Sequence, residues 1–347
     1  MECRTPALHH HKNLPTTMAV TMAEITKLRH LTSAGLMDCK KALAETNGDI
    51  EAAVEILRKK GQAVAAKRED RQASEGCVLA KNENGFAAIV ALKCETDFVA
   101  KNAGFVALTQ KLLDAAVANK VKTLDELKAL AIDGKKVEDL IVEEVGKTGE
   151  KMEIGAYECI EAASVTSYNH QGNKLSTIVG FNLADVDYQV GRDVAMQVAS
   201  MNPVAVDRDS VPANIIESER NVAIEKTKEE QIMKAVEAAL KKAGINPAHV
   251  DSESHIESNM AKGWITQEEA DKARQIIKET SEAKAANLPQ QMIENITKGR
   301  LNKFFKESCL MEQEYVKDAS MTIGQFLEQS QKGLVAVSFK RVNLNED

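Results

Sequence analysis

The positions of proline constrain the fold of this 347-residue chain more than any other feature of its sequence. After Pro6 and Pro15 the next proline is Pro203, and three more follow at positions 212, 247 and 289. Proline interrupts helices and central strands because it lacks a backbone N–H and fixes φ. The sequence therefore predicts continuous domains up to about position 203 and a segmented helical region beyond it. A chain of this length is expected to form two or three compact units.

The composition favours helices and argues against nucleic-acid binding. Hydrophobic residues make up 44% of the chain, which is enough for real cores, while aromatic residues contribute only 4%. Ala, Lys and Glu are plentiful, and these residues favour helices that close by aliphatic packing. The formal net charge is −7, whereas a protein that neutralises many phosphates normally carries a basic surplus. Direct nucleic-acid binding is therefore disfavoured as the main activity.

Neither the usual catalytic motifs nor a membrane segment is found along the sequence. It has no Gly-x-Gly-x-x-Gly, no Walker-type glycine loop, no Gly-x-Ser-x-Gly and no His-Glu-x-x-His. The six cysteines lie far apart and are predicted to be reduced thiols rather than metal ligands. No segment reaches the ~20 apolar residues that a membrane helix requires. We therefore expect no enzymatic activity, no cofactor, no metal and no membrane contact, and a cytoplasmic location.

The N-terminal part is predicted to contain a disordered extension, residues 1–21, and a small helical domain, residues 22–61. The domain carries three apolar stripes of helical spacing. They comprise positions 25, 28 and 31, then 36, 39, 42 and 43, then 50, 53, 54 and 57. Asp49 is placed to cap the third helix and Gly61 to end it. A charged linker is expected over residues 62–74.

The next part, residues 75–147, is predicted to combine a β-hairpin with helices. Apolar runs at 77–81 and 86–94 flank a turn that contains glycine, which indicates two paired strands. A long helix is expected over residues 97–119, and residues 124–146 are also expected to be helical. The order is therefore a hairpin followed by helices.

The same order of elements recurs in a second part, which comprises residues 148–210 and 306–347. Strands are expected over residues 152–166 and 174–183, and a helix over residues 188–201. We infer an internal duplication of a unit that consists of a β-hairpin and a helix.

Residues 211–305 are predicted to form an antiparallel helical hairpin. Amphipathic patterns at 212–243 and 289–305 indicate its two long helices. Residues 244–287, which include the only tryptophan, Trp264, are interpreted as helical material inserted at its tip. A last strand, residues 334–342, is expected to return to the core sheet. The predicted fold class is thus α+β, with the helical hairpin inserted before the C-terminal strand.

The most informative segment lies where a predicted strand ends and a helix begins. Asp97 suits a helix N-terminus because its carboxylate can accept orphan backbone N–H groups. Phe98 has two interpretations. With Phe105 seven residues further on, a regular helix would put both rings on the core face. Alternatively, Phe98 precedes the regular helix and protrudes beside Asp97 as an aromatic and acidic tip.

At this segment the chain resembles the translation elongation factor Ts family, whose members unload GDP from elongation factor Tu. The matching segments run in family order over roughly positions 22 to 342. They are MDCKKAL at 37–43, NGDIE at 47–51, TDFVAKNAGF at 96–105, SYNH at 167–170, KGRLNKF at 298–304 and TIGQFL at 322–327. The first and third together are highly specific, and the others support them.

The resemblance implies a fold, a partner and a set of roles. The fold has a three-helix domain of ubiquitin-associated (UBA) type, a two-part α+β core and a coiled-coil excursion, here enlarged by residues 244–287. The residues that match the stretch dislodging Mg²⁺ from the GTPase are Thr96, Asp97, Phe98 and Val99, with Phe98 as a wedge between partner helices. The residues that match partner contacts are Arg29, Leu36, Met37, Thr148, Gly149 and His170. The implied partner is elongation factor Tu, and self-association is left open.

Two other classes of function remain as alternatives. The UBA-like bundle, with residues 35–37 in a loop between helices, is elsewhere a protein-binding module, so the chain could be an adaptor without exchange activity. A metal or thiol enzyme is the second alternative, and it would require bound metal or a fast-reacting cysteine.

Overall fold

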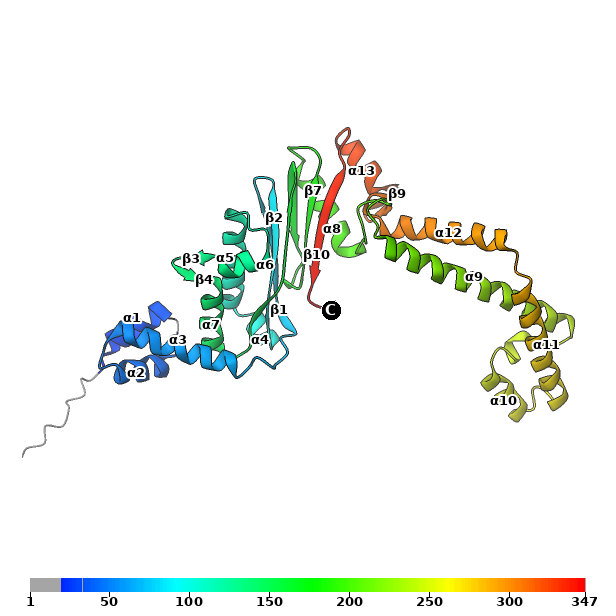
Figure 1. Ribbon diagram of the computed structural model, residues 1–347, viewed down its shortest axis with the longest axis horizontal. Coiled ribbons are helices and arrows are strands. Elements are labelled where there is room, and N and C mark those ends of the chain that lie inside the picture. Colours follow the sequence, from blue (N-terminus) through cyan, green and yellow to red (C-terminus); the bar gives the residue numbers. More distant parts are fainter. Residues whose placement is uncertain (1–19, 33, 347) are drawn as a thin grey trace, which may run out of the picture. The chain divides into compact units, whose positions relative to one another are not determined.

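A computed structural model of the chain describes residues 20–32 and 34–346, and these form two compact units with mixed helices and strands (Figure 1). The first unit contains the residues up to Ser200 and the closing segment from Ala336, and the second contains Met201–Val335. The predicted N-terminal extension lies outside the described residues up to position 19. Within the described ranges, no helix combines the length and the apolar content needed to cross a bilayer.

The first unit begins with three short helices that pack on one another, α1 (Met22–Thr32), α2 (Leu36–Glu45) and α3 (Ile50–Ala66). The Asp49 carboxylate accepts a hydrogen bond from the Ala52 N–H at 3.0 Å, so the predicted cap of α3 is confirmed. Two predicted core positions are wrong, since Leu31 and Leu36 are 54% and 41% exposed. A bundle of this size buries only a narrow stripe of each helix. Its core consists of Ile25, Leu28, Cys39, Ala42, Leu43 and Ala53.

Gly61 does not end the third helix, contrary to the prediction, because α3 continues to Ala66. At Gly61 the helix instead packs closely on α7 (Val137–Thr148). A Cβ atom at position 61 would lie 3.0 Å from the Val142 carbonyl oxygen, and one at Gly146 would lie 3.1 Å from the Gly61 Cα. The two glycines therefore permit a close helix–helix approach, and the first residues of the predicted 62–74 linker are helical.

Two three-stranded antiparallel sheets form the centre of this unit. The first has the order β1 (Glu75–Glu83), β2 (Phe86–Cys94) and β5 (Glu153–Glu161). The second has the order β10 (Ala336–Asn343), β7 (Leu175–Phe181) and β6 (Ser164–Asn169). The predicted hairpin turn is confirmed at Asn84 and Gly85, whose φ angles are 48° and 74°. The predicted C-terminal strand is confirmed as β10, which pairs with β7.

One predicted strand, residues 152–166, is in fact two strands that join different sheets, because β5 pairs with β2 whereas β6 pairs with β7. The apolar pattern continues across the join, so it carries no sign of the change of sheet. The predicted helical stretch 124–146 is likewise interrupted. Between α6 (Leu124–Ala129) and α7 lies a small hairpin of β3 (Ala131–Ile132) and β4 (Lys135–Lys136).

The first sheet lies between helices on one side and the second sheet on the other (Figure 1). Its helical side packs on α5 (Ala103–Ala118) and α7, and its other side packs on β6 and β7. Asn169 joins the sheets by exchanging two hydrogen bonds with the backbone of Ala80, at 2.6 and 2.9 Å. The hairpin β6–β7 is followed by α8 (Tyr188–Met201), as predicted.

The second unit is built around α9 (Ala213–Lys242) and α12 (Gln290–Ser308), which lie side by side (Figure 1). Their bounds agree with the two predicted helices. The stretch between them contains a 3₁₀ turn (Pro247–His249), α10 (Glu253–Ala261) and α11 (Gln267–Ala286), which form a small core with the end of α9.

Residues 306–335, which we expected to join the core, pack instead within the second unit. They comprise the end of α12, a 3₁₀ turn (Leu310–Glu312), β8 (Glu314–Tyr315), β9 (Asp318–Thr322) and α13 (Ile323–Ser330). Cys309 packs with Ala205 and Val211 at the start of this unit. This local packing holds the segment beside α12.

Candidate functional site

Phe98 protrudes from the first unit, with 84% of its surface exposed. The predicted helix 97–119 is two helices, a single turn α4 (Asp97–Ala100) and then α5. The Thr96 hydroxyl caps the first by accepting the Val99 N–H at 3.5 Å, and the Asn102 side chain caps the second. Since the chain restarts its helix at Asn102, Phe98 does not share the buried face of Phe105. The prediction of a protruding ring is confirmed.

We call residues 96–99 the tip. The ring of Phe98 is exposed, whereas its neighbours are anchored to the core. Val99 packs against the core beneath it, and the following residue, Ala100, is buried. Asp97 forms an ion pair with Lys101 at 2.7 Å. This hydrogen bond lowers the pKa of the Asp97 carboxyl below its usual value. At neutral pH the tip thus carries an exposed aromatic ring next to a charged, paired carboxylate.

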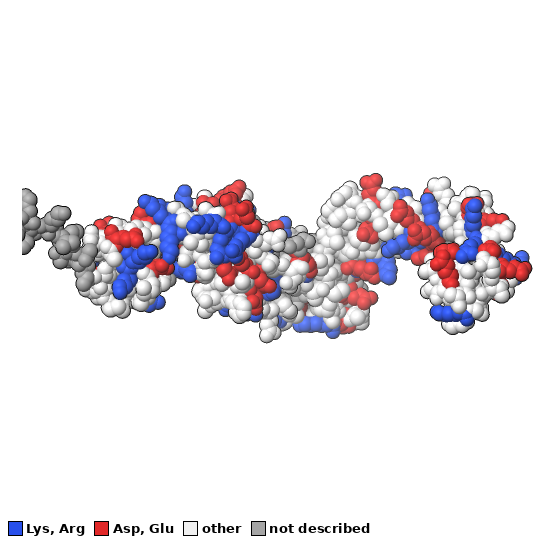
Figure 2. Space-filling view, turned by 90° about the horizontal axis from the view of Figure 1, so that it is seen from below, with Lys and Arg blue, Asp and Glu red and all other residues white. Residues whose placement is uncertain are grey.

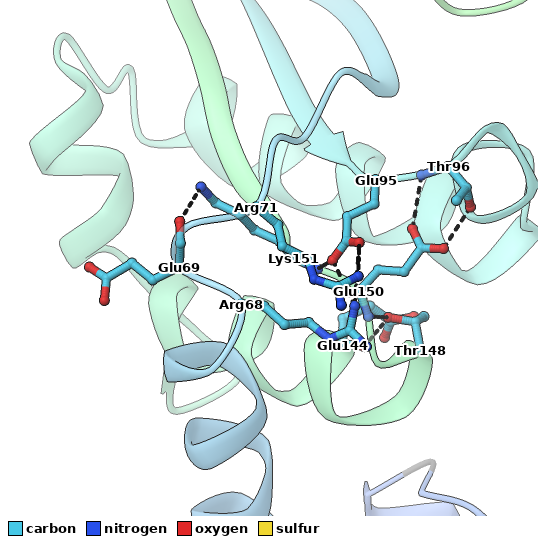
Figure 3. Close-up of polar contacts among 9 residues, drawn as sticks. All are labelled: Arg68, Glu69, Arg71, Glu95, Thr96, Glu144, Thr148, Glu150 and Lys151. Atoms are coloured by element: carbon cyan, nitrogen blue, oxygen red, sulfur yellow. Dashed lines mark hydrogen bonds and ion pairs between the residues drawn. The ribbon is translucent and has the colours of Figure 1, made fainter.

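A glutamate from the end of α7 holds the first residue of the tip (Figure 3). The Glu150 carboxylate accepts the Thr96 N–H at 3.0 Å and the Thr96 hydroxyl at 2.6 Å. Gly149 ends α7 in the left-handed conformation with φ 73°, which turns the chain toward the tip. The Thr148 hydroxyl accepts the Glu150 N–H at 3.3 Å. Two of the predicted partner-contact residues, Thr148 and Gly149, therefore shape the segment that supports Thr96.

A second glutamate lies immediately before the tip and is almost enclosed by donors (Figure 3). Glu95 accepts hydrogen bonds from Arg68 and Arg71, each at 3.0 Å, and from the backbone N–H of Lys151 at 2.7 Å. Its side chain is only 13% exposed. Burial alone would raise the pKa of Glu95, but the hydrogen bonds from Lys151, Arg71 and Arg68 outweigh it and lower the pKa to about 2. The carboxylate is therefore charged at any physiological pH.

His170 lies in the exposed turn between β6 and β7, where its Nδ1 is 2.9 Å from the Tyr168 hydroxyl. The same turn is tied to the first sheet, because the Asn173 carbonyl accepts the Val78 N–H at 2.7 Å. Lys174 pairs with Glu75 at 2.9 Å, and Glu75 lies opposite Cys94, the residue before Glu95. The turn thus lies at the end of the first sheet from which the tip projects.

The remaining predicted contacts, Arg29, Leu36 and Met37, lie on the three-helix bundle. Leu36 opens α2 and Met37 belongs to its first turn, so these residues are not in a loop as expected. All three are exposed, Met37 by 69%. Met22 and Leu31 of α1 are exposed apolar residues of the same bundle. In the described part of the chain, no hydrogen bond or ion pair links these residues to the tip.

The described residues contain no group of three or more His, Cys, Asp or Glu side chains that could hold a metal ion. Burial raises the pKa of the thiols of Cys77, Cys94 and Cys309 to about 11, 12 and 11. These three thiols therefore stay protonated and are poor nucleophiles. Charges of both signs are interspersed on the face shown in Figure 2.

The roles of the residues that support the tip could not be predicted from the sequence. These residues are Arg68, Arg71, Glu95, Glu150 and Lys151. The two arginines lie in a charged run that is typical of a solvated linker, so no local signal separates them from their neighbours. Glu95 belongs to the informative segment itself, but nothing in the local sequence predicts that it binds two arginines. Glu150 contacts Thr96 across 54 residues, and no pattern in a single sequence reveals such a pair.

Comparisons with known proteins agree with the resemblance noted from the sequence. A family model described as "Elongation factor TS" matches residues 95–346. A protein of Phocaeicola vulgatus named "Elongation factor Ts" is 61% identical over 331 residues, which cover 95% of this chain and 100% of that protein. Proteins of the same name from Bacteroides thetaiotaomicron and Porphyromonas gingivalis are 59% and 45% identical over the same shares of both chains.

Proposed function

Because the chain belongs to the elongation factor Ts family, whose role is in translation elongation, we propose that it is a guanine-nucleotide exchange factor that releases GDP from elongation factor Tu. The single observation that carries the proposal is Phe98, an aromatic ring 84% exposed on a short, anchored turn. Aromatic rings are enriched at protein interfaces, where burial against the partner is favourable. With this partner the protein would work in the cytoplasm.

Exchange requires differential binding and no proton transfer. The factor must bind the nucleotide-free GTPase more tightly than the nucleotide-bound form, and the nucleotide then weakens the factor's binding by the same amount. Each tenfold loosening needs about 1.4 kcal/mol of coupling. Full burial of one Phe supplies about 1.5–3 kcal/mol, which corresponds to roughly ten- to a hundredfold. Other contacts must therefore contribute when a tightly held nucleotide is displaced.

We assign those contacts to two surfaces. The exposed residues Arg29, Leu36 and Met37 would dock the three-helix bundle, as a UBA-like module, on the nucleotide-binding domain of the GTPase. Thr148, Gly149 and His170, at the end of the core that carries the tip, would provide the second contact. Docking at both surfaces would hold Phe98 against the partner helices.

We propose that the factor promotes GDP release by causing the loss of Mg²⁺ from the GTPase. The ion neutralises phosphate charge and tolerates little distortion of its octahedral shell. A ring inserted between the helices of the GTPase would shift groups that support this shell. Asp97, which is paired with Lys101 at 2.7 Å, would support the tip from its own side of the interface.

The domain roles follow from the same family membership. We propose residues 22–61 as the UBA-like domain after the 1–21 extension, and residues 62–74 as its linker. Residues 75–147, together with 148–200 and 336–347, would be the duplicated core, since 201–335 belong to the second unit. Residues 211–305 would be the coiled-coil excursion, with 244–287 as its enlargement.

The proposal is tested by the release of fluorescently labelled GDP from elongation factor Tu. Addition of this protein at micromolar concentration should accelerate release by orders of magnitude over the spontaneous rate. The same rate at every concentration of the protein would contradict the proposal.

An adaptor without exchange activity is the second candidate, and the exposed Met37 favours it, because methionine is enriched at protein interfaces. Met37→Asp tests both functions, because position 37 is 69% exposed and the bundle should still fold. An exchange factor would need a higher concentration of the variant for the same stimulation. An adaptor would stimulate release in neither form, and the variant would bind the GTPase more weakly than the wild type.

A further inference from the structure

The tip has no intrinsic stability, and its order must come from outside. α4 is a single turn of four residues, Asp97–Ala100. A helix this short is not stable in water by itself, because the conformational entropy lost in forming the first turn outweighs the free energy of its hydrogen bonds. Its second residue carries the exposed Phe98 ring, so packing cannot hold the ring itself in place. Besides the packing of Val99 and Ala100 on the core, two glutamates, Glu95 and Glu150, restrain the start of the turn.

The two glutamates hold the same short stretch from different sides. Glu150 uses both carboxylate oxygens on Thr96, one for the backbone N–H and one for the hydroxyl. Glu95 binds Arg68, Arg71 and the Lys151 N–H with both of its oxygens. Charge-assisted hydrogen bonds of this kind are roughly twice as strong as neutral ones. We call this pair of carboxylates, with their donors, the clamp.

The clamp also connects the tip to the three-helix bundle. Arg68 and Arg71 follow directly after α3, the last helix of the bundle, and both bind Glu95. α3 packs on α7 through Gly61 and Gly146, and the chain leaves α7 into Glu150. The chain segment after α3 therefore binds Glu95 through Arg68 and Arg71, and the segment after α7 binds Thr96 through Glu150. Residues 95 and 96 are consecutive and lie just before Phe98.

We propose that Glu95 and Glu150 are positioning residues, which keep Phe98 oriented relative to the bundle so that docking of the bundle presents the ring ready for insertion. This inference rests on the proposed exchange function. Neither carboxylate needs to touch the GTPase. Pre-ordering the ring removes an entropic cost that would otherwise be met during insertion.

The clamp is expected to act on the rate of nucleotide release and not on docking. The exposed bundle surface and the His170 turn do not depend on either carboxylate, so the complex still forms when the clamp is weakened. A loosened tip samples many orientations, and only a fraction of complexes then insert the ring. The maximal rate therefore falls while the half-saturating concentration stays constant.

Substitution by glutamine gives the sharpest test, because it preserves shape. In Glu150→Gln one amide oxygen can still accept from Thr96, but the amide NH₂ would face the other donor. Glu95→Gln removes the charge that Arg68 and Arg71 share. Glu161→Gln is the matched control, since the Glu161 carboxylate binds two cations, Lys120 at 3.1 Å and Lys122 at 2.5 Å, at the opposite end of β5.

Each clamp variant is titrated against the GTPase loaded with labelled GDP. We expect the maximal rate to fall roughly tenfold for either clamp variant, with the half-saturating concentration unchanged within about twofold. Glu161→Gln should leave both quantities unchanged. A rise in the half-saturating concentration with an unchanged maximal rate would overturn the inference, and so would wild-type kinetics in both clamp variants.

Hydrogen exchange supplies an independent readout that a general loss of fold would not mimic. The amides of Val99 and Ala100, which bond to Thr96, should exchange faster in Glu150→Gln. The amides of α5 should keep their protection, because Asn102 caps that helix separately. Unchanged exchange at Val99 and Ala100 would overturn the positioning role.

Phe98→Ala separates this inference from the proposed function. If that variant loses stimulation while both clamp variants retain it, the ring acts without the clamp and the inference fails alone. If Phe98→Ala stimulates as well as the wild type, the proposed role of the tip fails first.

Discussion

The two hairpin-and-helix repeats of the core, which both lie in the first unit, each carry an acidic residue followed by an aromatic one after their second strand, and they support this pair differently. Asp97-Phe98 follows β2, and Asp187-Tyr188 follows β7. Both aromatic rings are exposed, Phe98 by 84% and Tyr188 by 69%. Tyr188 begins the long helix α8, whose first N–H groups bond to Asp187 at 2.9 and 3.2 Å.

Phe98, in contrast, belongs to an isolated turn that residues far along the chain hold in place. The first repeat has thus separated the aromatic turn from its long helix, and residues distant in the chain support the turn. The second repeat keeps the turn and the helix continuous. The comparison shows that an exposed aromatic ring after a hairpin lies either on an isolated turn or at the start of a long helix, depending on contacts with distant residues.

The largest expected effect comes from removing each ring in turn. Phe98→Ala should lower the stimulated rate of labelled-GDP release about ten- to a hundredfold, which is the equivalent of burying one Phe side chain. Tyr188→Ala, its counterpart, should change the rate less than about twofold. Equal losses of the stimulated rate in the two variants would contradict the difference inferred between the two repeats.

A stability measurement compares a glycine near the start of each long helix. A Cβ atom at Gly191 of α8 would lie 2.2 Å from the Thr166 hydroxyl oxygen, whereas one at Gly104 of α5 would lie 3.1 Å from the Asn102 side-chain oxygen. Gly191→Ala should reduce the free energy of unfolding by about 1–3 kcal/mol, and Gly104→Ala should change it by less than about 0.5 kcal/mol. Urea denaturation followed by circular dichroism measures both, and a larger loss at Gly104 would contradict the packing described here.

The clamp should make the first unit sensitive to acid. Glu95 has a pKa of about 2 in the folded chain against an ordinary value of 4.5, so its contribution to stability is complete above pH 4.5 and is lost as the pH falls toward 2. The difference in melting temperature between wild type and Glu95→Gln should therefore be constant near neutrality and shrink over that range. A difference that grows on acidification would reverse the assigned sign.

The smallest effect is expected at the edge of the interface. His170→Ala should raise the half-saturating concentration in the exchange assay about two- to fivefold, because exposed polar contacts contribute little each. The maximal rate should not change, since the clamp and Phe98 remain intact. A fall in the maximal rate alone would mean that His170 supports the tip and does not contribute to docking. The role of the tip would then depend on both repeats.

Much of the architecture could be predicted because its signals are local. Asp49 caps α3 and Asn84-Gly85 turns the first hairpin because side-chain and backbone geometry within a few residues decide such features. Gly61 was assigned wrongly because a glycine that ends a helix and one that admits a neighbouring helix look the same in a sequence. Leu31 and Leu36 fitted the apolar stripes, but the small bundle has no partner element to cover them.

The sequence alone determined the family, most of the long helices and strands, and the segment that contains the tip, since motifs and caps depend on residues close together in the chain. Only the tertiary structure decided that the Phe98 ring is exposed and that residues 152–166 divide between two sheets. It also showed that Glu95 and Glu150 meet at the tip. These features depend on which distant segments pack together, and hydrophobic periodicity carries no information about that choice.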